Sequence, residues 1–249
     1  MKTSNRLLVI LFLIILVGIA AIMIHLRSAI NKNEGPWLSG SRVVIEQKRQ
    51  LPAFDQIRIK DQIKVSFRQD SVYSIWVKAD SNIVDHLVTK VEGHELQIYM
   101  DEMVRRARKR EVEISAPKLS RLKALEGSVF RTENNLQAEN FEAHVLAGSQ
   151  LHLNINCNEL LTNFTAGSQG NFEGQANFFK TTANAGSIIN AHEMEAQKCE
   201  INANAGCIVK VHVSKSLDVN ASSGSMINYR GEPRIENLNL SSGAQIKQQ

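Results

Sequence analysis

The stretch TAGSQGNFEGQANFFKTTANAGSIINAHEMEAQKCEINANAGC, residues 165–207, contains three copies of one short pattern. The copies are Ala166-Gly167-Ser168, Ala185-Gly186-Ser187 and Ala205-Gly206-Cys207. Working outward in both directions, a glycine followed by a small residue recurs at Gly127, Gly148, Gly167, Gly186, Gly206, Gly224 and Gly243. Successive gaps are 21, 19, 19, 20, 18 and 19 residues. Such a constant period is an internal repeat.

The columns on both sides of the glycine alternate in polarity. The residue three before it is small or apolar in every repeat, whereas the residue four before it is mostly polar and often asparagine. After the glycine, the third residue is apolar or glycine, and the fourth is Arg131, His152, Asn171, Asn190, Lys210, Asn228 or Lys247. A period of two is typical of strands with one buried face.

These patterns predict an all-β fold, a right-handed parallel β-helix of about seven coils of ~19 residues over 118–249. We expect a glycine at each corner because a side chain would clash there or because φ is positive. The small residue directly before each glycine should point inward, where a turning wall leaves little room. Strands stacked at ~4.8 Å give a repeat stack of roughly 30 Å. Leucine-rich repeats share the period but need a leucine consensus.

The preceding part of the chain is also rich in strand patterns. Residues 51–117 read as the β-rich first half of a head domain, because runs such as Ile57-Arg58-Ile59-Lys60 alternate. Helical spacing occurs once, at Ile83-Val84, Leu87-Val88 and Val91, and predicts a short helix stopped by Gly93. Residues 28–50 are expected to be a tether.

Residues 1–27 are expected to be a membrane anchor or signal. Eighteen uncharged residues lie between Arg6 and His25, close to the ~20 that cross a bilayer as a helix. A cleaved signal peptide is the alternative, but the apolar run continues past the small residues at 18–20. We therefore expect an uncleaved transmembrane helix with the rest of the chain exported, either periplasmic or at the cell surface.

The sequence resembles the bacterial family called putative auto-transporter adhesin, head GIN domain. The resemblance covers roughly residues 53–246 and rests on Phe54-Asp55-Gln56-Ile57, Leu96-Gln97-Ile98, Ala116-Pro117-Lys118-Leu119 and the recurring small-glycine-serine corners. It implies an exported β-helical domain of the cell envelope. It carries no catalytic residues to transfer.

Catalytic groups are sparse in the repeats. Pectin-cleaving β-helix enzymes need clustered acids, yet residues 118–249 contain a single aspartate, Asp218. Only Glu193 and Glu195 share a face by alternation. Serines after the glycines repeat with the corner and are interpreted as structural. We therefore predict no catalytic residues, no cofactor and no enzyme activity.

Metal and disulfide chemistry are equally weakly indicated. His192 and His212 both stand six residues after a glycine and should stack, with Glu173 and Arg230 on either side. A divalent metal could bind there, but a polar ladder explains the same spacing without a third nitrogen or sulfur ligand. The cysteines at 157, 199 and 207 occupy three different columns, so we interpret them as small core residues. A disulfide between Cys199 and Cys207 is the alternative.

Positive charge is concentrated in the first part of the chain. Residues 1–117 hold 18 Lys and Arg against 13 acids, whereas residues 118–249 hold 11 against 12. The centre is Arg105-Arg106-Ala107-Arg108-Lys109-Arg110, which could meet phosphates or anionic headgroups. A solvated loop is the simpler interpretation, and since no aromatic residues accompany the run, nucleic acid is not an expected partner.

The sequence thus favours a non-enzymatic, adhesion-like binding module of the cell envelope. Stacked walls of asparagine, serine, threonine and lysine suit an extended polymer such as a polysaccharide, or an envelope protein. A polysaccharide-active enzyme and a periplasmic scaffold or sensor are the alternatives. The unpaired strand edge after Gly243 could also join a second chain.

Overall fold

The computed structural model describes Phe12 and residues 16–24 and 37–249. It divides into two units, Met1–Leu38 and Ser39–Gln249. In the first, residues 16–24 are helical. Within the part of the chain that is described, no helix has the length and apolar character to cross a membrane. Of the residues between Arg6 and His25 where a transmembrane helix is expected, 7–11 and 13–15 lie outside the described residues.

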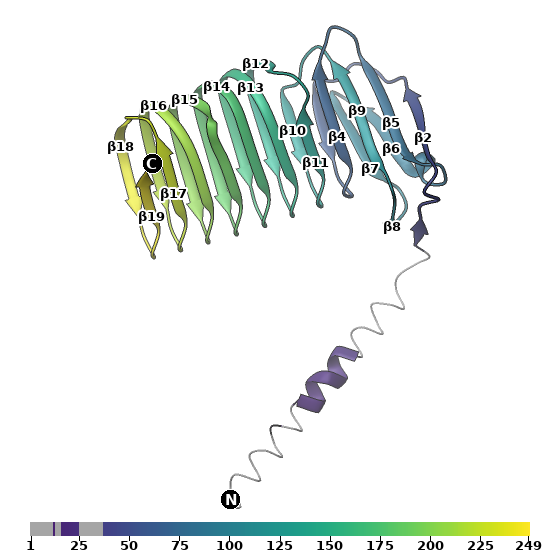
Figure 1. Cartoon of the computed structure of the whole chain (residues 1–249), viewed down its shortest axis with the longest axis horizontal. Coiled ribbons are helices and arrows are strands. Elements are labelled where there is room, and N and C mark those ends of the chain that lie inside the picture. Colours follow the sequence, from purple (N-terminus) through teal and green to yellow (C-terminus); the bar gives the residue numbers. More distant parts are fainter. Residues whose placement is uncertain (1–11, 13–15, 25–36) are drawn as a thin grey trace, which may run out of the picture. The chain divides into compact units, whose positions relative to one another are not determined.

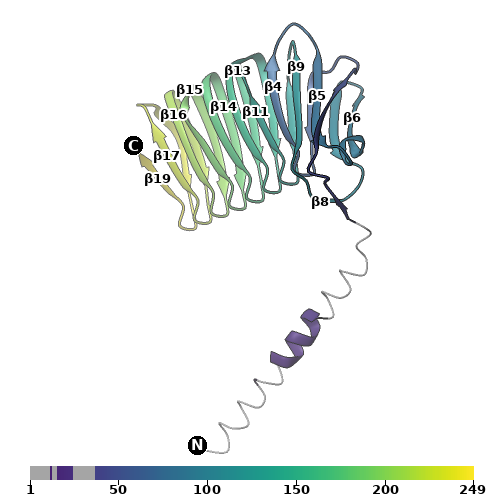
Figure 2. The same ribbon diagram turned by 45° about the vertical axis from the view of Figure 1, so that its right-hand side comes forward.

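The second unit is a β-solenoid of about seven turns (Figures 1 and 2). Its leading strands are β2 (Val44–Arg49), β3 (Gln56–Ile59), β4 (Lys64–Gln69), β5 (Ser74–Asp80), β6 (Leu87–Glu92), β7 (Glu95–Met100), β8 (Val104–Arg106) and β9 (Arg110–Ala116). The repeats form β10 (Arg121–Ala124), β11 (Val129–Thr132), β12 (Leu136–Val145), β13 (Gln150–Phe164), β14 (Gln169–Asn184), β15 (Ile188–Asn204), β16 (Ile208–Ala221), β17 (Met226–Arg230), β18 (Arg234–Leu240) and β19 (Gln245–Gln248). A short strand, β1 (Leu38–Ser39), stands at the boundary between the units.

The long strands bend midway, so each contributes to two walls. Wall A contains the segments that precede the glycines, in the order β6, β7, β3, β10, β12 and the second halves of β13 to β16, then β18. Wall B contains the segments that follow them, in the order β2, β5, β9, β4, β11 and the first halves of β13 to β16, then β17 and β19. Pairing between successive repeats is parallel throughout.

The corners are two-residue turns with both central residues in the left-handed region. The seven glycines have φ between 70° and 78°, and the residues before them have φ between 50° and 60°. In the turn at Ala147-Gly148, the amide of Ser149 donates to the carbonyl of Leu146 (3.3 Å), as in a type I′ turn. A Cβ on six of the seven glycines would meet nothing within 4 Å. Positive φ, rather than crowding, is therefore the reason for glycine.

The inward small residue is the one after the glycine, not the one before it as the sequence suggested. Ala147, Ala166 and Ala185 are exposed, because a left-handed residue at the first turn position turns its side chain outward. Ser168 and Ser187 are completely buried. The Ser168 hydroxyl donates to the carbonyl of Val145 (2.8 Å), which satisfies a buried polar group.

The interior is filled by stacks of apolar side chains from both walls. On wall B, Leu151, Gly170 and Ile189 stack in register, and on wall A, Leu160, Phe179, Cys199 and Leu217 do the same. All of these residues are buried. Removing their apolar surface from water at about 25 cal/mol per Å² is the main stabilising contribution.

The leading strands form coils of the same solenoid. Strand β3 pairs in parallel with β10, and β4 with β11. The turn between them, at Asp61-Gln62, has φ values of 64° and 58°, so it repeats the corner geometry without a glycine. On the other side, β3 and β4 pair in parallel with β7 and β9, so residues 95–116 form the coil next to 56–69.

Two sequence-based assignments in this region are wrong. Residues 44–49 form β2, antiparallel to β5, so the tether does not extend through residue 50. The expected helix at 83–91 is reduced to one 3₁₀ turn, Val84–His86, and Leu87–Glu92 is strand β6. Gly93, with φ of 61°, lies in the hairpin turn between β6 and β7. The β-branched residues Val88, Thr89 and Val91 favour the pleated sheet, where β6 pairs with β7.

Candidate functional site

One row of outward-facing side chains crosses every strand of wall B. Ladder partners connect Lys48, Trp76, Glu113, Ser66, Arg131, His152, Asn171, Asn190, Lys210, Asn228 and Lys247 in that order. All but Asn228 are at least partly exposed. Neighbouring members are about one strand spacing apart, ~4.8 Å. The row therefore runs along the solenoid at a constant repeat.

The leading end of this row is hollowed. Two adjoining hollows of about 390 and 380 Å³ share Ser66 and Glu113. We call them together the wall B groove, whose main lining residues are Lys64, Ser66, Arg68, Ser74, Trp76, Glu111, Glu113, Ser115, Arg131, Glu133, Gln150 and His152. The groove therefore extends across β5, β9, β4, β11 and β13.

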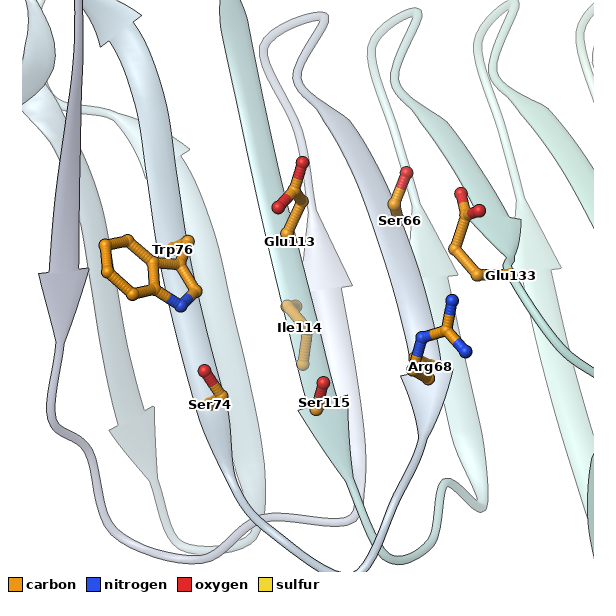
Figure 3. Close-up of a pocket in the computed structure, with 8 residues that line it drawn as sticks. All are labelled: Ser66, Arg68, Ser74, Trp76, Glu113, Ile114, Ser115 and Glu133. Carbon is orange, nitrogen blue, oxygen red and sulfur yellow. The ribbon is translucent and has the colours of Figure 1, made fainter.

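Three strands distant in sequence assemble the first hollow. Figure 3 shows Trp76 and Ser74 on β5, Glu113 and Ser115 on β9, and Ser66 and Arg68 on β4. Their side chains share one face because β5 and β9 are antiparallel with Trp76 opposite Glu113, and β9 and β4 are parallel with Glu113 opposite Ser66. The remaining three side chains lie on the same face because each is two residues along its strand from one of these, and side chains alternate between the two faces. No short motif could reveal this arrangement.

Trp76 is the large aromatic side chain of the groove. It is 38% exposed, although tryptophan is highly buried on average. The ammonium of Lys48 lies 5.6 Å from the ring centroid, a cation–π contact that orients the indole. An exposed indole beside hydroxyl groups is suited to contact with the apolar face of a sugar ring.

The three acids of the groove are ion-paired, whereas two of its exposed cations have no partner among the described residues. Glu113 forms an ion pair with Lys78 (2.7 Å), Glu111 with Lys109 (2.9 Å) and Glu133 with Arg131 (3.5 Å). The hydrogen bond to Glu113 raises the pKa of Lys78 above its ordinary value, and Glu46 adds to it. Within the described chain, the side chains of the exposed Arg68 and Lys64 make no hydrogen bond or ion pair. The uncommitted charge of the groove is therefore positive.

A second polar ladder lines the bend opposite the glycine corners. The Asn177 amide donates to Asn158 (3.0 Å), Gln197 to Asn177 (2.8 Å), and the Lys215 ammonium to Gln197 (2.7 Å). These groups satisfy one another from coil to coil. They stabilise the bend and leave less hydrogen-bonding capacity for a ligand than the wall B groove does.

His192 and His212 do not stack as the sequence suggested. A bulge between Ala191 and Glu195 moves His192 out of register, and His212 pairs with Glu195 and Arg230. Among the described residues, no group of three histidines, cysteines or acids is placed to hold a metal ion. Burial lowers the pKa of His192, and the nearby cations Arg230 and Lys210 lower it further.

The neighbouring glutamates, Glu193 and Glu195, have different partners. Glu193 is opposite Glu173, and its carboxylate lies 3.9 Å from Arg230. Glu195 is opposite Gln175 and His212.

The cysteines are separate from one another. All three described cysteines are free thiols, so Cys199 and Cys207 form no bridge. Burial raises the pKa of Cys157 to about 12, which keeps this thiol protonated and unreactive.

Sequence reasoning also missed a pair of carboxyl groups at the leading corners. A hydrogen bond between Asp61 and Glu126 raises the pKa of Glu126, with a smaller contribution from burial. The Asp61 carboxylate accepts the amide of Met100 (2.9 Å). Glu126 lines a hollow on wall A together with Lys60, Lys90 and Tyr99. The pair lies on adjacent coils, a proximity that becomes visible only once β3 is paired with β10.

The far end of the solenoid is open in the described chain. Strands β18 and β19 each pair with one neighbour, β16 and β17 respectively. Ile235, Leu238 and Leu240, which continue the core stacks of wall A, are 39%, 45% and 39% exposed.

Comparison with solved structures identifies the same architecture elsewhere. A putative lipid binding protein from Parabacteroides distasonis superposes with a TM-score of 0.73 at 18% identity, over 86% of this chain and 100% of that one. A putative adhesin from Bacteroides fragilis gives a TM-score of 0.78 at 18% identity, over 85% and 100%. A putative adhesin from Parabacteroides merdae gives 0.71 at 13% identity, over 86% and 100%. At these identities the likeness establishes the fold alone.

A search of curated proteins gives no significant match. The family described as putative auto-transporter adhesin, head GIN domain matches residues 53–233, which span β3 to the end of β17 and contain the Asp61-Gln62 corner and both halves of the wall B groove. The match covers well over half of the chain. The protein belongs to the putative auto-transporter adhesin, head GIN domain family.

Proposed function

We propose that this protein is a non-enzymatic binding module of the cell envelope that holds an acidic polysaccharide in the wall B groove. The observation that carries the proposal is the pairing of an exposed indole, Trp76, with the uncommitted guanidinium of Arg68 in one hollow. The indole would stack on a sugar ring, and the guanidinium would form a bidentate pair of hydrogen bonds with a uronate carboxylate.

The rest of the groove suits the same ligand. Ser66, Ser74 and Ser115 offer hydroxyl groups to sugar hydroxyls, and Lys64 supplies a second cation that has no ion pair within the described part of the chain. Beyond the groove, the row continues through His152, Asn171 and Asn190 with one polar group per coil. A chain molecule lying along that row could make a series of weak contacts that add up.

The polar lining also discriminates between ligand classes. One of the similar solved structures is that of a putative lipid binding protein. A lipid tail needs an apolar channel, whereas most of the groove here is lined by charged residues, serines, Gln150 and His152. The lining therefore favours a hydroxylated, charged polymer. The family's adhesin designation supports an exported location.

Turnover is not part of the proposal. Glycoside hydrolysis uses two carboxyl groups, one held protonated to act as the acid. The three groove glutamates are each ion-paired with a cation, so none is a free carboxyl group facing the ligand space. A polysaccharide-active enzyme and a scaffold or sensor are the competing functions, and a binding assay with matched variants separates them.

Binding of polygalacturonate and alginate would be measured against neutral dextran by affinity electrophoresis. Trp76→Ala and Arg68→Ala should each weaken binding to the acidic polymers by about tenfold or more. Matched controls lie on wall A: Tyr99→Ala removes an aromatic ring that Lys60 and Lys90 flank, and Arg58→Ala removes an exposed arginine that has no partner among the described residues.

Each outcome decides between the functions. Loss of binding confined to the wall B variants supports the proposal. Equal effects from the wall A variants, or equal retention of dextran, would remove the groove as the binding site. Release of new reducing ends from either polymer would establish the enzyme instead. If no polymer binds, the proposed polysaccharide-binding function is contradicted, and the scaffold or sensor function is favoured instead.

A further inference from the structure

A second charged surface lies away from the wall B groove. Four exposed arginines, Arg42, Arg105, Arg106 and Arg108, come from two segments far apart in sequence. We call them the arginine cluster. The segments are the turn before β2 and the loop around β8, which occupies the corner position of the β7–β9 coil.

A buried carboxylate holds the two segments together. Asp80, at the end of β5, is completely buried and accepts the amides of Arg42 (3.0 Å), Arg108 (3.1 Å) and Lys109 (3.1 Å). The Arg108 guanidinium also donates to the carbonyl of Arg42 (3.4 Å). Asp80 thus holds the loop in place through backbone amides, and its charge also interacts with the guanidinium of Arg108.

Several nearby charged groups are already engaged elsewhere. Glu111 pairs with Lys109, and Asp101 with His86 (2.9 Å). Arg110 donates to the carbonyl of Asp61 (3.0 Å) and is not part of the cluster.

Apolar side chains accompany the arginines. Met103 and Val43, which flank the cluster in sequence, are 57% and 62% exposed. The surface thus combines positive charge with exposed apolar side chains, the combination that suits a lipid interface.

The chain itself leads from this surface to the apolar segment. The amide of Gly40 donates to the carbonyl of Arg106, so the start of the second unit lies beside the cluster. Fifteen residues, 25–39, separate this point from the uncharged run Leu7–Ile24. A chain of that length spans at most roughly 50 Å. Any bilayer that holds the run is within that reach of the cluster.

We propose that the arginine cluster docks on the anionic phospholipid headgroups of the bilayer that Leu7–Ile24 enters. Guanidinium groups form bidentate hydrogen bonds with phosphate, and juxtamembrane basic residues are attracted to anionic surfaces. The cluster would then hold the leading end of the solenoid at the membrane, with Met103 and Val43 at the interface. This function differs from polysaccharide binding, since the wall B groove shares no residue with the cluster.

Hydrogen–deuterium exchange of the full chain in lipid nanodiscs tests the proposal. Amides of residues 101–108 should exchange several-fold more slowly in discs with one third phosphatidylglycerol than in pure phosphatidylcholine. Added salt at about 0.5 M should remove the difference, because the Debye length then falls below ~5 Å. The variant Arg106→Gln with Arg108→Gln should lose most of the protection, about fivefold in the docking equilibrium for each charge removed.

The control is Arg58→Gln with Arg234→Gln, two exposed arginines elsewhere on the solenoid, which should keep the protection. Thermal unfolding would establish that both double variants fold. Equal exchange in the two lipid compositions, or full protection in the Arg106 and Arg108 variant, would overturn the proposal. So would protection by free polygalacturonate without discs, or failure of the chain to enter discs of either kind.

Discussion

Gly170 lies directly against the ring of Phe164: a Cβ built on Gly170 would be 2.5 Å from Cζ of Phe164 and 2.8 Å from the ring of Phe172. The position belongs to a stack whose other members include Leu151 and Ile189. The missing side chain is thus replaced by an aromatic ring from the opposite wall. Volume is conserved across the two walls rather than within each column.

This relationship predicts that Gly170→Ala destabilises the solenoid by about 1–3 kcal/mol, because an added methyl overpacks the core. Urea unfolding followed by circular dichroism would measure it. Combining it with Phe164→Leu should recover part of the loss, since the smaller side chain vacates the space. If the double variant loses more unfolding free energy than the two single variants lose together, this account of the packing is contradicted.

A corner glycine should respond to substitution in a different manner. Gly206 has φ of 70° and open space around its missing Cβ, so only backbone conformation restricts the residue. Gly206→Val should cost about 1–3 kcal/mol, whereas Gly206→Asn should cost less, because asparagine tolerates the left-handed region. Equal melting temperatures for the two variants would show that φ does not govern this corner.

Asp80 should make stability depend on pH on the acid side. Burial alone would raise its pKa, but hydrogen bonds from the amides of Arg108, Arg42 and Lys109 outweigh it and hold the pKa below its ordinary 3.8. Its contribution is therefore present above pH 3.8 and lost as pH falls through the lower folded value. We expect Asp80→Asn to lower stability by about 2–4 kcal/mol near pH 7, with a smaller difference at an acidic pH below the folded pKa of Asp80. Chemical unfolding at both pH values would measure this, and a constant difference would contradict the assignment.

Glu126 should act in the opposite direction. The hydrogen bond with Asp61 raises its pKa above 4.5, so the stability from the shared proton is present below pH 4.5 and lost as pH rises through the folded value. Glu126→Gln keeps a donor at all pH values and should be more stable than the parent near pH 7, by less than about 1 kcal/mol because the site is solvated. The two proteins should converge near pH 4, and melting curves at both pH values would show whether they do.

The repeats were predictable because each coil carries the same alternation around one glycine, and the backbone at Gly148 or Gly186 allows few residues other than glycine. The Asp61-Gln62 corner could not be predicted because it adopts the same left-handed turn without glycine. The order of coils in the leading part could not be predicted either, since β7 and β9 lie outside β3 and β4. Local patterns indicate which residues form strands, but they carry no information on which strand pairs with which.

The wall B groove shows the same limit. Ser66, Trp76 and Glu113 come from strands whose adjacency depends on that pairing, so composition alone gave only a low aromatic content and a general expectation of polar walls. The expected inward column before the glycine failed for a local reason, because Ala166 and its counterparts adopt positive φ.

The binding claim is tested most directly by hydrogen–deuterium exchange of the protein with and without saturating polygalacturonate. We predict slower exchange in β4, β5 and β9, centred on Arg68, Trp76 and Glu113, with β3, β7 and β10 of wall A unchanged. Protection spread equally over both walls, or confined to wall A, would contradict the assignment of the groove.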